Sequence, residues 1–143
     1  MSGFPLSFGT NVNLTNSFGG GSRPNYTAGC SKATNGSAVS RLNGWFNTSC
    51  FTQPSPFTFG NESRTDPQLR APGVADWDSA VVKKFPIARD GRVNVQFRAE
   101  VYNLFNRVQF GYPGETQGTA NFGIVGSQQN LPRILQFALR VGF

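Results

Sequence analysis

Few side chains in this chain of 143 residues could do chemistry. No histidine is present, so no imidazole can activate a serine or a cysteine, which excludes Ser-His and Cys-His nucleophiles. The seven carboxylates are Glu62, Asp66, Asp76, Asp78, Asp90, Glu100 and Glu115. No spacing among them singles out a general acid and a general base, and the sequence carries no phosphate-binding or dinucleotide-binding fingerprint. We therefore expect that the protein is not an enzyme and uses no cofactor.

The two cysteines, Cys30 and Cys50, are the other reactive candidates. Two thiolates without histidine do not complete a zinc site, so we expect no bound metal. Two interpretations stay open, free thiols or a disulfide formed in an oxidising compartment. We favour the disulfide, because both cysteines lie among turn-forming polar residues rather than in an apolar segment.

The formal net charge of +6 does not indicate a nucleic-acid partner. The arginines are spread along the whole chain, and Lys83-Lys84 is the only adjacent basic pair. Because a nucleic-acid site shows clustered basic residues or a known motif, we expect none here.

The elements that position these residues can be found from the pattern of side chains. In several segments, apolar and polar side chains alternate as they do along a β-strand. Four such segments span residues 3–15, 76–87, 93–106 and 133–143. In the last, one face carries Leu135, Phe137, Leu139, Val141 and Phe143, and the other carries Gln136, Ala138, Arg140 and Gly142. A length of about 11 residues with one apolar face is typical of a tilted strand that crosses a bilayer.

The third segment places charges opposite its apolar face. Arg98 and Glu100 alternate with Val95, Phe97 and Ala99. Such charges are costly in a soluble core but are tolerated in a water-filled barrel lumen. Arg98, Glu100 and Arg140 are therefore candidate lumen-facing residues. They could contact a substrate or plug, although we favour the simpler interpretation of a solvated interior.

The links between these segments alternate in length. A short link with Asp90-Gly91 joins the second segment to the third, while residues 16–75 and 107–132 form long loops. Outer-membrane barrels alternate short periplasmic turns with long extracellular loops in this way. We therefore predict an all-β fold: an antiparallel meander of about four strands, forming a fragment of a transmembrane β-barrel.

Several motifs carry a family resemblance. The segment 101–106 (VYNLFN) and the C-terminal segment 135–143 (LQFALRVGF) resemble the last two strands of TonB-dependent transporters. The runs 40–51 (SRLNGWFNTSCF) and 57–61 (FTFGN), with Arg64-Thr65 and Asp76-Trp77-Asp78, are similar to the Oar-like subgroup common in Acidobacteria, whose members carry a carboxypeptidase-regulatory-like domain.

This resemblance implies a location in the bacterial outer membrane and a set of partners. These are outer-membrane lipid, the rest of the barrel and its plug, the TonB complex, the barrel-insertion machinery, and a small ligand such as a siderophore, glycan or peptide. It also implies an insertion signal at the C-terminal strand, formed by Phe137, Leu139, Val141 and Phe143.

We expect the chain to be a C-terminal fragment that cannot transport alone, because four strands do not close a barrel. The N-terminus shows no signal peptide, and no apolar stretch is long enough for a transmembrane helix. The alternative is a small secreted or surface β-rich protein that binds a partner through its long loops.

Overall fold

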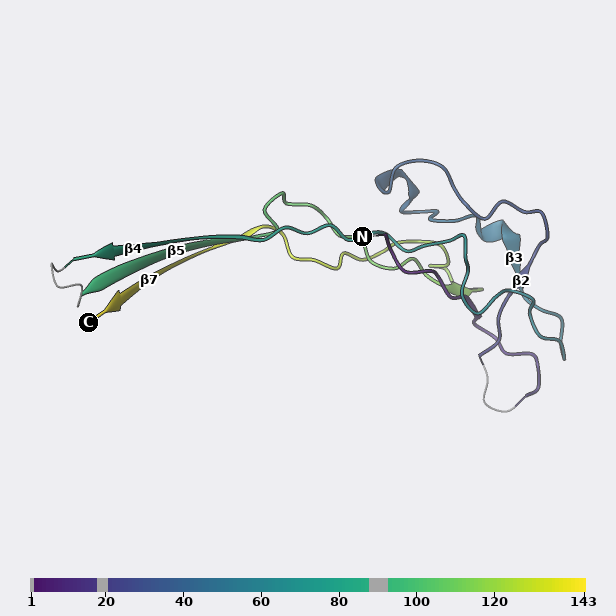
Figure 1. Cartoon of the computed structure of the whole chain (residues 1–143). Helices are drawn as coiled ribbons and strands as arrows, with labels where there is room; N and C mark the ends of the chain where they lie inside the picture. The colour runs from purple at the N-terminus through teal and green to yellow at the C-terminus, as the bar shows by residue number, and fades with distance from the viewer. Residues whose placement is uncertain (1, 18–20, 88–92) are drawn as a thin grey trace. The chain divides into compact units, whose positions relative to one another are not determined.

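A computed structural model describes residues 2–17, 21–87 and 93–143 (Figure 1). Its regular elements are seven β-strands and two 3-10 turns, Val39–Arg41 and Thr48–Cys50, so the predicted all-β class is confirmed. None of the helical turns in these ranges is long and apolar enough to cross a membrane. The chain divides into two compact units, which we call the loop unit (Met1–Val74 and Gln109–Gln128) and the sheet unit (Ala75–Val108 and Gln129–Phe143).

The sheet unit is a three-stranded antiparallel meander in the order β4 (Ser79–Pro86), β5 (Asn94–Tyr102) and β7 (Ile134–Gly142). The three long strands lie side by side in Figure 1 and fall within the predicted segments 76–87, 93–106 and 133–143. The amide of Ile87 donates to the carbonyl of Val93 at 2.9 Å and continues the β4–β5 ladder. The predicted Asp90-Gly91 turn lies outside the described residues.

The strand predicted over residues 3–15 is wrong. Only β1 (Gly9–Thr10) is a strand there, and it pairs in parallel with β6 (Thr116–Gln117). The alternation in the sequence is real, but it buries Leu6 and Phe8 in the loop unit. The backbone partners also change within a few residues: Leu6 bonds to residues 66 and 69, and Gly9 bonds to residue 115. The segment is therefore extended without joining a barrel-type sheet.

The two predicted loops, together with the N-terminal segment, pack around a core of their own. Besides β1 and β6, this loop unit contains the antiparallel pair β2 (Asn25–Tyr26) and β3 (Phe51–Thr52). Its buried apolar residues are Leu6, Phe8, Trp45, Phe46, Cys50, Phe51, Leu69, Ala71 and Val125. The rings of Phe8, Phe46, Phe51 and Phe122 all contact one another, with centroids 4.6 to 6.1 Å apart. Such pairs add about 0.5–1.5 kcal/mol each beyond the burial of their area.

Candidate functional site

The register of the sheet unit separates its side chains into two chemically different faces. Val81 pairs with Ala99 and Ala99 with Phe137, so alternate residues of the three strands share one side. This side, the apolar face, consists of Ser79, Val81, Lys83, Phe85, Val95, Phe97, Ala99, Val101, Leu135, Phe137, Leu139 and Val141. Most of its large apolar side chains are exposed, and Leu139 retains 69% of its accessible surface. A contiguous apolar surface of this kind marks a protein or membrane contact.

The opposite side, the polar face, carries all three predicted lumen residues. Arg98 pairs with Ala138, Gln96 with Arg140, and Glu100 with Gln136, which places the charged residues in adjacent rows. Arg98 and Glu100 also form an ion pair. The structure thus brings Arg98, Glu100 and Arg140 to one face, as the alternation predicted.

The strands have the length that a bilayer requires. Strands β5 and β7 contain nine residues each, and β4 contains eight. At about 3.3 Å per residue, nine residues extend about 30 Å, and a tilt of about 40° reduces their height to about 23 Å. This matches the apolar band of about 25 Å around an outer-membrane barrel.

The candidate insertion signal lies at the end of β7. Phe137, Leu139 and Val141 are exposed on the apolar face, and Phe143 follows the strand with its side chain fully exposed. The last pair of the ladder is Asn94 with Gly142, so Phe143 extends beyond the paired part of β5. The four large apolar side chains of this segment are therefore all exposed.

The motif at residues 103–106 forms a tight turn at the opposite end of β5. Asn103 (φ 52°) and Asn106 (φ 49°) both adopt the left-handed conformation, which asparagine tolerates better than most residues. The Asn103 amide group donates to the carbonyls of Arg107 and Leu131 at 3.0 and 3.1 Å, and its Oδ1 accepts from the Arg107 amide at 2.9 Å. One side chain therefore connects the end of β5 to the segment that precedes β7. The family resemblance drew attention to this motif, but the sequence did not show that Asn103 forms a turn and links these two segments.

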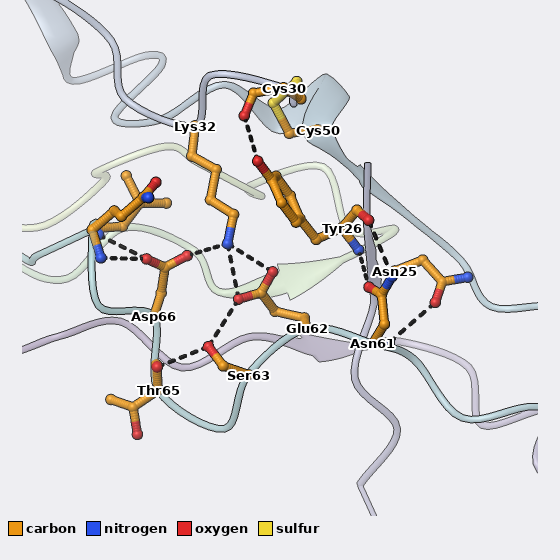
Figure 2. Close-up of polar contacts among 12 residues, drawn as sticks. Asn25, Tyr26, Cys30, Lys32, Cys50, Asn61, Glu62, Ser63, Thr65 and Asp66 are labelled. Atoms are coloured by element: carbon orange, nitrogen blue, oxygen red, sulfur yellow. Dashed lines mark hydrogen bonds and ion pairs between the residues drawn. A yellow bond between two sulfur atoms is a disulfide. The ribbon is translucent and has the colours of Figure 1, made fainter. Parts of the chain in front are cut away.

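A buried ion triad organises the loop unit (Figure 2). The Lys32 ammonium donates to both oxygens of Glu62 at 3.0 and 2.9 Å and to Oδ2 of Asp66 at 2.6 Å. All three side chains are at most 7% exposed. The ammonium also lies 4.1 Å from the centre of the Tyr26 ring, whose hydroxyl donates to the carbonyl of Cys30 at 2.8 Å.

The triad shifts the titration of two of its members. Burial acts to lower the pKa of Lys32, but the hydrogen bonds to Asp66 and Glu62 outweigh it, so the pKa lies above its ordinary value. Burial acts to raise the pKa of Asp66, but the bond from Lys32 and those from the Gln68 and Leu69 amides hold it below its ordinary value. Lys32 and Asp66 are therefore both charged at neutral pH. The members of the triad are 30 and 34 residues apart in sequence, and no local pattern could have revealed it.

The structure joins Cys30 and Cys50 in the predicted disulfide, with their Cα atoms 5.6 Å apart. Figure 2 shows it beside Tyr26, above the ion triad. In the described ranges, no three His, Cys, Asp or Glu side chains lie close enough to hold a metal ion.

The comparison with known families agrees with the two-faced sheet. Residues 1–136 match the family described as an outer membrane beta barrel domain. Searches among curated proteins and among solved structures gave no significant match. Proteins of this family reside in the outer membrane of bacteria, and so does this one. With nearly its whole length matched, the chain belongs to the outer membrane β-barrel family.

Proposed function

We propose that this protein forms part of the barrel wall and surface loops of a TonB-dependent transporter of the Oar-like subgroup. The observation that carries the proposal is the sheet unit, in which strands of bilayer length expose one apolar face and one charged face. In a barrel wall, lipid covers the apolar face and the water-filled lumen solvates Arg98, Glu100 and Arg140. The TonB-dependent type rests on the resemblance of the VYNLFN segment and of the C-terminal strand.

The order of the elements sets the orientation in this proposal. The short link at 87–93 lies on the periplasmic side, and the chain reaches the same side at Phe143. The segments that lead into the loop unit leave the sheet at the other end, beyond Tyr102 and before Ile134, so the loop unit belongs outside the cell. There its folded surface selects a small ligand such as a siderophore, a glycan or a peptide.

The protein acts through its partners rather than by catalysis. The rest of the barrel and its plug complete the pore, and the TonB complex supplies the energy for uptake. The insertion machinery recognises the exposed C-terminal strand at Phe137, Leu139, Val141 and Phe143. The proposal includes no enzymatic step and no cofactor.

A pair of neighbouring substitutions tests the membrane assignment. Phe137→Arg places a charge in the middle of the apolar face, whereas Ala138→Arg places the same charge on the polar face one residue away. A cation at the bilayer midplane costs about 2–4 kcal/mol on the lipid side of a barrel, and lumen positions tolerate charge. We therefore expect Phe137→Arg alone to reduce the fraction of protein that resists urea extraction from isolated outer membranes.

The alternative, a secreted or surface binding protein, makes the opposite prediction. Its chain would be a monomer in detergent-free buffer, and the two arginine variants would behave alike. The TonB-dependent type is tested separately by ligand uptake in cells with and without TonB. Equal uptake in both would refute that type and leave the membrane assignment intact.

A further inference from the structure

Lys83 is the one charged side chain on the apolar face of the described sheet. It lies on β4 opposite Phe97, which in turn pairs with Leu139, so its row is otherwise apolar. No described residue forms an ion pair with its ammonium. The Nζ atom instead lies 5.1 Å from the centre of the Phe85 ring. Phe85 is two residues nearer to the 87–93 link, so the ammonium is directed toward that end of the sheet.

The depth of Lys83 allows this ammonium to reach the membrane surface. Pro86, the last residue of β4, lies three positions beyond Lys83. This distance is about 10 Å along the strand and about 8 Å in depth at a tilt of about 40°. A lysine stem lies along apolar surface while its charged end reaches water or headgroups. Phe85 belongs to the level where barrels carry an aromatic girdle.

We propose that Lys83 and Phe85 form a binding site for the phosphate of an anionic phospholipid in the leaflet on the side of the 87–93 link. This inference rests on the proposed barrel-wall function. The ammonium supplies the charge, and the ring of Phe85 holds the lysine stem toward the headgroups. Anionic lipid is favoured because the sequence from 83 to 92 is basic, with Lys83, Lys84, Arg89 and Arg92 against Asp90.

The neighbouring Lys84 supplies a matched control. It pairs with Gln96 on the polar face, so Lys83→Gln and Lys84→Gln remove the same charge one residue apart on opposite faces. We would measure how the full chain partitions into phosphatidylcholine vesicles with and without one quarter phosphatidylglycerol. A lysine near an anionic membrane surface contributes about fivefold to binding. We expect Lys83→Gln to lose about fivefold of the preference for phosphatidylglycerol, and Lys84→Gln to lose less than twofold.

The other outcomes overturn the inference in distinguishable ways. Equal losses in the two variants would assign the preference to general charge attraction rather than to a site. No loss in Lys83→Gln would show that its ammonium does not reach the lipid. Competition by inorganic phosphate at equal concentration would identify a free-ion site instead of a lipid site. A wild-type chain that stays a monomer in detergent-free buffer and enters neither vesicle would refute the barrel-wall function itself, and the inference with it.

Discussion

Replacing Lys32 with methionine tests whether the ion triad holds the loop unit together. The substitution keeps most of the volume of the stem but removes the ammonium that contacts Glu62 and Asp66. Both carboxylates are then buried near each other without a cation. Removal of one partner from a buried ion pair costs about 3–5 kcal/mol. Because domains are stable by only about 5–15 kcal/mol, we expect Lys32→Met to remove a large share of the stability of the loop unit.

Trp45 reports on this transition directly. Its side chain is buried, and the indole N–H donates to the carbonyl of Arg70 at 2.7 Å within the loop unit. The other tryptophan, Trp77, belongs to the sheet unit, so a Trp77→Phe background leaves one reporter. Urea titration of the full chain in detergent, followed by Trp45 fluorescence, gives the change in the free energy of unfolding.

The pH dependence of the stability should have opposite signs in the wild type and in Lys32→Met. In the wild type the lowered pKa of Asp66 stabilises the folded unit above about pH 4, and this stabilisation is lost as the pH falls further. The raised pKa of Lys32 stabilises it below about pH 10.5 and is lost above that value. Lys32→Met leaves Asp66 buried without its cation, and burial then raises the pKa of this carboxyl, so acidification from pH 7 to 5 should stabilise the variant.

Two results would refute this reasoning. A loss below about 1 kcal/mol would show that water reaches the triad, as in an exposed ion pair. A variant that follows the wild-type pH profile would show that its carboxyls are not buried together. The triple variant Lys32→Met, Glu62→Gln, Asp66→Asn is the control, because Asn keeps the oxygen that accepts from the Gln68 and Leu69 amides. It should recover most of the lost stability, since neutral groups need no cation.

Three further predictions concern single features of the two units. Replacing Cys30 and Cys50 with serine should cost the loop unit about 3 kcal/mol in the same urea titration, because the disulfide closes a loop of 20 residues. Asn103→Ala should destabilise the sheet unit by about 2–3 kcal/mol, because it loses the side-chain hydrogen bonds and places alanine at an unfavourable φ, and limited trypsin digestion should then cleave the unit faster. Asn103→Gly, which tolerates this φ but also lacks the side chain, should recover only part of the lost stability. Gly60→Ala should lower the urea midpoint of the loop unit, because the added Cβ overlaps two backbone carbonyls of a neighbouring segment. Gly21→Ala is the control, because a Cβ at Gly21 meets nothing within 4 Å and should leave the urea midpoint unchanged.

The sheet unit was predictable because its information is local. Alternate residues of a strand face opposite sides, so the parity of Phe137, Leu139 and Val141 against Arg140 was sufficient to assign the faces. The three long strands needed only that pattern and a short link. The same rule misassigned residues 3–15, because parity states which side chains are buried but not which backbone pairs with which. Leu6 and Phe8 have the parity of a strand face, but they are buried in the core of the loop unit rather than against lipid.

The turn at Asn103 lies between these two cases. Its residues are adjacent in sequence, and a left-handed φ at an asparagine is a local preference. Its function is not local, because the side chain reaches the carbonyl of Leu131, 28 residues away. A motif search can mark such a turn, but only the fold shows that it joins the end of β5 to the start of β7.

The loop unit needs long-range cross-links because it has little regular backbone pairing. Its four strands contain two residues each, so ladder hydrogen bonds cannot hold it together as they hold the sheet. The disulfide, the ion triad and the cluster of phenylalanine rings supply that missing constraint, and all three connect segments far apart in the sequence. Tyr26 links the first two, because its ring covers the Lys32 ammonium while its hydroxyl bonds to Cys30. A unit held in this way has a defined surface of its own, and the proposed selection of a ligand outside the cell requires such a surface.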